Sequence, residues 1–145
     1  MTHYRKDKKK KWLYRYVLLK RKLDVLNKRL VLLDQKIDSI QHSNDSALAM
    51  GCNRVILEDL LIDKADLENR IARMREQSLP IKNEILDRIN TLNNPCDVEL
   101  LKDRFIYDIP MSKIADSRNR TERTMFYHFK SVIDKLPFSD LYKND

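Results

Sequence analysis

Residues 12–40 read WLYRYVLLKRKLDVLNKRLVLLDQKIDSI, and apolar side chains recur in this stretch at alternating spacings of four and three. This period is typical of the buried seam of a coiled-coil helix. The seam consists of Trp12, Tyr16, Leu19, Leu23, Leu26, Leu30, Leu33, Ile37 and Ile40. The apolar face is widened by Leu13, Val17, Leu18, Val25, Val31 and Leu32. We therefore expect this helix to contact more than one neighbour, in a bundle or an oligomer.

A second periodic stretch covers residues 57–92, after a connection at residues 41–53 that contains Ser, Asn, Asp and the single glycine, Gly51. Such polar, glycine-containing segments allow a chain to reverse direction. The seam of this stretch is interrupted by Lys64 and Ser78. Pro80 either kinks the helix or restarts it with Ser78 as N-cap, because proline lacks the backbone donor of a helix interior.

The charges beside the two seams favour an antiparallel pairing. One flank of the first seam is basic, with Arg15, Lys22, Arg29 and Lys36. In a parallel homodimer this flank would meet Lys20, Asn27 and Asp34, which is a poor match. Asp63 and Glu84 lie near the second seam and suit it better, so we predict a helical hairpin over residues 12–92.

Three short helices are predicted after Asn93, Asn94 and Pro95, over residues 98–107, 111–117 and 121–136. Asp97 and Thr121 are suitable N-caps for the first and third of these helices. Pro110 fits the first turn of the second helix, and Asn119 can adopt the left-handed conformation that is usual for glycine in a turn.

Together these patterns predict an all-α chain with a long N-terminal helical hairpin and a C-terminal tri-helical helix-turn-helix domain. The expected parts are a basic tail at residues 1–11, the hairpin at 12–92, the helix-turn-helix at 97–136 and a tail at 137–145. With one glycine and four prolines among 145 residues, a strand-rich fold is disfavoured.

The third short helix has an apolar face and a polar outer face. We expect Met125, Phe129, Val132, Ile133 and Leu136 to pack on Leu101, Phe105, Ile106, Ile114 and Ala115. The outer face carries the candidate readers of DNA bases, Glu122, Arg123, Phe126, Tyr127 and Lys130. The candidate phosphate contacts are Lys113, Arg118, Arg120, Thr121 and Thr124.

Aromatic residues in a small bundle are more often partly buried or dimer-facing, which is the alternative for Phe126 and Tyr127. His128 is expected at the surface.

The net charge of +7 is concentrated at the N-terminus and around residues 118–130, which makes nucleic acid the default partner. The run Lys8 to Lys11 is equally compatible with a solvated tail and with a phosphate-binding arm.

The sequence LLKDRFI at residues 100–106, followed by Ile114, Ala115, Thr121, Thr124 and Met125, resembles the fourth region of sigma factors. The order of a long helical region and then this helix-turn-helix, with DLENRI at residues 66–71 on the second long helix, also resembles phage-encoded transcriptional regulators of the RinA/ArpU type. The resemblance implies transcription control, often activation of phage late or autolysis genes. Pro110, Arg118 and Asn119 depart from the usual cap, apolar residue and turn glycine, which affects the expected turn geometry and target sequence more than the fold.

Other chemistries have little support in the sequence. Cys52 and Cys96 are isolated, and only three histidines are present, so we predict no metal site, no cofactor and no disulfide. No glycine-rich phosphate loop or nucleophile motif indicates an enzyme. No apolar run is long enough for a signal peptide or a membrane span, so we expect a cytoplasmic protein.

The leading hypothesis is therefore a homo-oligomeric phage or prophage transcription regulator that binds double-stranded DNA, with Arg123, Glu122 and Tyr127 reading bases. RNA polymerase is a further candidate partner. One rival is a DNA-packaging adaptor similar to a small terminase subunit, although in those proteins the DNA-binding part usually comes first. Another rival is a coiled-coil protein that binds RNA polymerase or a regulator without contacting DNA.

Overall fold

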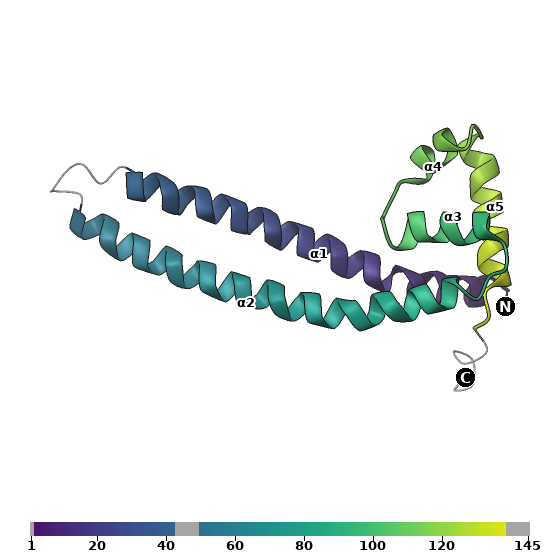
Figure 1. Ribbon diagram of the computed structural model, residues 1–145, viewed down its shortest axis with the longest axis horizontal. Coiled ribbons are helices and arrows are strands. Elements are labelled where there is room, and N and C mark those ends of the chain that lie inside the picture. The colour runs from purple at the N-terminus through teal and green to yellow at the C-terminus, as the bar shows by residue number, and fades with distance from the viewer. Residues whose placement is uncertain (1, 43–49, 139–145) are drawn as a thin grey trace. The chain divides into compact units, whose positions relative to one another are not determined.

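The computed structural model describes residues 2–42 and 50–138, and this part of the chain consists of helices and their connections, without a strand (Figure 1). The helices are α1 (Thr2–His42), α2 (Met50–Ile89), α3 (Pro95–Phe105), α4 (Met111–Ser117) and α5 (Glu122–Lys135). The predicted all-α class is confirmed. The chain forms two compact units, which we call the hairpin unit (Leu19–Gln77) and the terminal unit (Met1–Leu18 with Ser78–Asp145).

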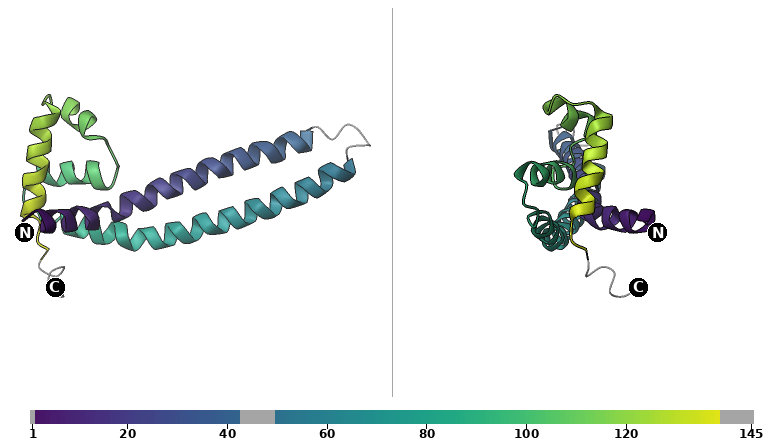
Figure 2. Two further views of the ribbon diagram at one scale, coloured as in Figure 1. Left: turned by 180° about the vertical axis from the view of Figure 1, so that it is seen from behind. Right: turned by 90° about the vertical axis from the view of Figure 1, so that its right-hand side faces the viewer.

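In the hairpin unit, α1 and α2 run antiparallel, side by side (Figures 1 and 2). The core of this unit contains Leu23 and Leu26 of α1 and Ile71 of α2. Leu30, Leu67 and Met74 pack against that core. The predicted seam therefore lies between two helices of one chain, as the hairpin interpretation requires.

An ion pair replaces an apolar contact where Lys64 interrupts the second seam. The Lys64 ammonium lies 2.8 Å from a carboxylate oxygen of Asp34 on α1. The hydrogen bond and the charge of Asp34 raise the pKa of Lys64. The Lys64 ammonium therefore remains charged at a seam position, with Asp34 as its partner.

The ends of the long helices differ from the prediction. The connection was expected at residues 41–53, but α1 continues to His42 and α2 already begins at Met50, while residues 43–49 lie outside the described part. Helix α2 also passes through Pro80 without a restart, although Ser78 was a possible N-cap there. Its tertiary packing compensates for the donor that Pro80 lacks, since Ser78 and Ile85 on either side are both buried.

The terminal unit contains the predicted core of the three short helices. Every residue expected to pack between α5 and its neighbours is at most 4% exposed: Leu101, Phe105, Ile106, Ile114, Ala115, Met125, Phe129, Val132, Ile133 and Leu136. The same cluster also includes Trp12 and Leu13 of α1 and Ile85 and Ile89 of α2. Residues 97–136, expected to form a separate domain, therefore share one core with the ends of the long helices.

Both expected tails are structured where the chain is described. Helix α1 begins at Thr2, so the basic segment expected as a tail at residues 1–11 is helical, which suits the high helix propensity of lysine. Lys9 directs its ammonium to the carbonyl oxygens of Asp134 and Leu136, at 3.4 and 3.3 Å, at the C-terminus of α5. Phe138, within the expected C-terminal tail, is buried edge-on against Trp12 with ring centroids 5.2 Å apart.

Helix α3 begins earlier than predicted. Its N-cap is Asn94, whose side-chain oxygen accepts a hydrogen bond of 3.0 Å from the backbone N–H of Cys96, with Pro95 in the first turn. Asp97, the predicted N-cap, lies instead within the first turn of the helix. The helix ends at Phe105, two residues before the predicted end.

Candidate nucleic-acid interface

Helix α5 starts where the sequence predicted. Asn119 has a φ of 53°, so it adopts the left-handed conformation in the turn between α4 and α5. Thr121 is the N-cap, and its hydroxyl oxygen accepts a hydrogen bond of 3.2 Å from the backbone N–H of Thr124. The hydroxyls of Thr121 and Thr124 also lie 2.8 Å apart. These two predicted phosphate contacts are exposed and simultaneously fix the start of the helix.

The position of α5 is fixed by its buried face. Phe129 stacks on Phe105 of α3, with ring centroids 5.5 Å apart, and Met125, Val132 and Ile133 complete the contact with the core. In Figures 1 and 2, α5 runs across α3 and is preceded by the shorter α4. The opposite face of α5 therefore points outward on a helix that packing holds in place.

Of the five residues predicted as base readers, Arg123, Tyr127 and Lys130 lie on this outward face. Glu122 and Phe126 lie at its edge, because each is seven residues before a buried residue of α5. Glu122, Arg123, Phe126 and Tyr127 are exposed, and Lys130 is half-buried. Phe126 and Tyr127 keep 41% and 58% of their surface accessible, so within one chain these aromatic rings are not buried. A cationic group lies over each ring. The ammonium of Lys130 is 4.5 Å from the ring centroid of Phe126, and the guanidinium carbon of Arg123 is 5.8 Å from the ring centroid of Tyr127.

The predicted phosphate contacts of α4 and the following turn differ in their exposure to solvent. Lys113 and Arg120 are exposed. Arg118 is half-buried and donates a hydrogen bond of 3.3 Å to the carbonyl oxygen of Cys96 in the first turn of α3. Arg118 therefore holds the turn against α3, which makes it a poorer candidate for a phosphate contact than the other two cations.

A hollow beside the outward face of α5 contains residues that the sequence did not link to it. It is lined by Lys10 and Tyr14 of α1, Arg104 of α3 and Met111 of α4, together with Glu122, Arg123, Phe126 and Phe129 of α5. The ammonium of Lys10 lies 5.6 Å from the Phe126 centroid. Arg104 donates to the Tyr14 hydroxyl at 3.0 Å and lies 3.4 Å from the Asp108 carboxylate. The basic N-terminal run thus reaches the same surface as Arg123.

Asp97 links α3 to α5 beneath the candidate interface. Its side chain is only 3% exposed, and its carboxylate lies 3.1 Å from Nε2 of His128 and 3.7 Å from the ammonium of Lys135. His128, expected as a surface residue, is half-buried through this contact. This buried carboxylate orients α5 on α3, because one of its oxygens is within hydrogen-bond distance of His128 and the other forms an ion pair with Lys135.

Asp103 lies in a second hollow, between α3 and the turn after α4. Burial is the main cause that raises the pKa of this carboxyl, and the negative charge of Glu99 raises it further, whereas Arg118 acts in the opposite direction. The ionised form of Asp103 is therefore disfavoured in the folded protein.

Comparisons with other proteins find no relative for this arrangement. No family model matches the sequence, no curated protein matches it, and no solved structure matches the fold. Within the described residues, no three His, Cys, Asp or Glu side chains lie close enough together to hold a metal ion. The helices of the described part also include none that is both long and apolar enough to cross a membrane.

Proposed function

We propose that this protein is a sequence-specific transcription regulator that binds double-stranded DNA with α5 as its recognition helix. The observation that carries the proposal is the outward face of α5, on which Arg123 and Tyr127 are exposed while the opposite face packs into the core, with Glu122 also exposed in the first turn. A helix held in this way can enter a major groove with its first turns against base edges.

Each side chain has a role that follows from its donors and acceptors. Arg123 can donate two hydrogen bonds to the N7 and O6 atoms of guanine, and Glu122 can accept one from the amino group of cytosine. Tyr127, one turn further along, is exposed enough to contact a base edge or a sugar. Lys113 on α4 and Arg120 in the turn before α5 are both exposed and are the proposed phosphate contacts.

The biological setting comes from the resemblance to sigma region four and to the RinA/ArpU-type regulators. On that basis we propose a phage or prophage activator of late or lysis genes that acts in the cytoplasm of the bacterial host, with RNA polymerase as a partner. The net charge of +7 supports DNA as the ligand, since long-range attraction to phosphates raises the rate and strength of binding.

The test is an electrophoretic mobility shift of the full chain on DNA fragments from the neighbourhood of its own gene, with competitor DNA and a salt series. We expect one fragment to shift selectively, and Arg123→Ala to weaken this selectivity at the cost of about 1–3 kcal/mol of binding free energy. The matched control is Arg75→Ala in the hairpin unit, an exposed arginine far along the sequence from α5. Absence of a shift on every fragment at low salt would refute the proposal.

A further inference from the structure

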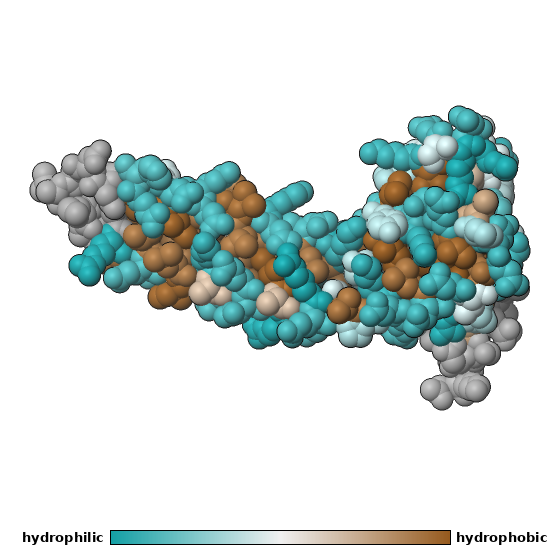
Figure 3. Space-filling model, viewed as in Figure 1, coloured by the Kyte–Doolittle hydropathy of each residue, from teal (hydrophilic) through white to brown (hydrophobic). Residues whose placement is uncertain are grey.

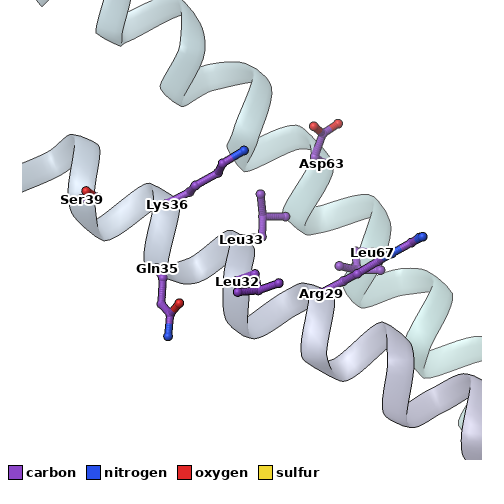
Figure 4. A pocket seen from close by; sticks show the side chains of 8 residues that line it. All are labelled: Arg29, Leu32, Leu33, Gln35, Lys36, Ser39, Asp63 and Leu67. Carbon is purple, nitrogen blue, oxygen red and sulfur yellow. The ribbon is translucent and has the colours of Figure 1, made fainter.

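One face of the hairpin unit contains an open groove between α1 and α2. It is lined by Arg29, Leu32, Leu33, Gln35, Lys36 and Ser39 of α1 and by Asp63 and Leu67 of α2. Figure 4 shows Leu32 and Leu33 from one helix and Leu67 from the other, with Arg29, Lys36 and Asp63 around them. The groove thus has an apolar centre with charged residues at its sides.

Much apolar surface remains uncovered in this unit. Leu32 is 63% exposed, although it lies in the groove, and Val25, seven residues before it on the same face, is 55% exposed. Ile56 of α2 is also exposed. Figure 3 shows apolar side chains gathered along the long helices between hydrophilic ones. Exposed apolar surface that gathers on one part of a protein typically marks an interaction surface.

The charges beside the groove are separated by helix. Arg29 and Lys36, seven residues apart, form a basic row on α1. Asp63 lies across the groove on α2, and Asp59 and Asp66, four and three residues from it, continue an acidic row on the same face. All five side chains are exposed, and none of them forms an ion pair with another residue of the described part.

We propose that this groove is a homodimer interface, in which the hairpin unit of a second copy packs on it with the two hairpins pointing the same way. A two-fold axis parallel to the hairpin and over the groove lays α1 of each copy on α2 of the other. Arg29 and Lys36 of each copy then face Asp63 and Asp66 of its partner, and Leu32 becomes buried. The face is self-complementary, which is the requirement for a two-fold interface.

The charge pattern also selects this arrangement over the other two-fold pairing. An axis across the hairpin would place α1 on α1 and bring the two basic rows together, where like charges oppose association. A partner without an acidic row would leave Arg29 and Lys36 unpaired at an apolar contact. The interface involves residues of the hairpin unit alone and is independent of DNA binding by α5.

Sedimentation of the full chain over a range of concentrations tests the interface. We expect a reversible dimer, whose dissociation constant rises about tenfold or more in Leu32→Asp and in Lys36→Glu, because each change acts twice across the two-fold axis. The matched control is Lys11→Glu, the same charge change at an exposed position of α1 outside the hairpin unit. Circular dichroism verifies that each variant keeps its helix content, as expected for substitutions at exposed positions.

A mixing experiment tests the proposed pairing of rows. One variant carries Arg29→Glu and Lys36→Glu, and the other carries Asp63→Lys and Asp66→Lys. Each alone brings like charges together and should be monomeric, whereas an equimolar mixture should form a heterodimer because both contacts again join opposite charges. A wild-type chain that stays monomeric at all concentrations overturns the proposal, as does equal dimerisation of wild type and Leu32→Asp.

Discussion

Lys10 illustrates how a single residue gains a role from packing that its sequence context leaves open. The run Lys8 to Lys11 fits a solvated tail and a phosphate-binding arm equally well from the sequence. In the structure, Lys10 lies over the ring of Phe126 and lines the hollow beside Arg123. A cation at this position adds to the positive potential of the proposed DNA-binding face.

We therefore predict that Lys10→Ala weakens binding to all DNA sequences by a similar factor, in contrast to Arg123→Ala. A phosphate contact carries no base information, so the preference for one site should persist, and the slope of log affinity against log salt should fall by about one. Fluorescence anisotropy over a salt series measures both quantities. Lys28→Ala, an exposed lysine of the hairpin unit, is the control. A changed site preference would contradict a phosphate role for Lys10.

Asp103 gives a prediction about pH at the same scale. Because burial and Glu99 raise its pKa in the folded state, folding is favoured by protonation, and this stability is lost as the pH rises through the raised value. Asp103→Asn cannot ionise and should melt at a higher temperature than the wild type at neutral pH. The difference should disappear in acid, below the ordinary pKa of an aspartate carboxyl, 3.8. Thermal melts at a series of pH values test this, and a variant less stable at neutral pH would contradict it.

The residues that the sequence identified correctly are those with local signatures. Thr121 and Asn119 are recognisable because capping and left-handed turns depend on a few neighbouring residues. The contact of Asp97 with His128 joins residues 31 positions apart, and that of Lys10 with Phe126 joins residues far more distant in the chain. Neither follows from a periodic pattern, because both depend on how the helices are assembled.

At the scale of elements, Asp97 connects α3 to α5. We predict that Asp97→Ala lowers the free energy of unfolding by about 1–2 kcal/mol, since it removes the hydrogen bond with His128 and the ion pair with Lys135, and both partners remain partly solvated. Chemical denaturation followed by circular dichroism measures the change. Asp116→Ala, which removes an exposed carboxylate from α4, should have little effect. Equal losses in the two variants would argue against a specific linking role for Asp97.

The helices themselves were largely predictable, because the seam of α1 and the apolar face of α5 repeat with the period of an α-helix. The ends of the helices were less predictable from the sequence. α1 extends ten residues further toward the N-terminus than the apolar pattern, because lysines continue a helix without contributing to a seam. Phe138 lies beyond the last helix, and its burial against Trp12 required the N-terminal part of the chain to be in place.

At the scale of the whole molecule, the helices α3 to α5 depend on the long helices for part of their core. Trp12 and Leu13 of α1 and Ile85 and Ile89 of α2 are all less than 10% exposed within the same cluster. The sequence indicated a boundary at residues 93–95 because Asn and Pro interrupt the helical pattern there. The helical pattern is interrupted there, since α2 ends at Ile89 and α3 begins at Pro95, but one hydrophobic core contains residues from both sides of this interruption.

This shared core predicts that a fragment of residues 97–136 is much less stable than the same segment in the full chain. Without the apolar partners from α1 and α2, its buried side chains are exposed to water, and so small a domain has little stability to lose. Thermal unfolding monitored by circular dichroism compares the two. Adding residues 78–96 and 137–138 should restore only part of the stability, because Trp12 and Leu13 are still missing. A fragment that melts as cooperatively and at the same temperature as the full chain would contradict the shared core.

Selection from a library of random DNA duplexes is the most direct measurement of whether this protein reads DNA through α5. The full chain should enrich a defined sequence motif, and Arg123→Ala should lose the preference for at least one base position while it retains salt-dependent binding. If the wild-type chain enriches no motif, or if Arg123→Ala enriches the same motif with the same strength, then α5 is not the recognition helix of a sequence-specific DNA-binding protein.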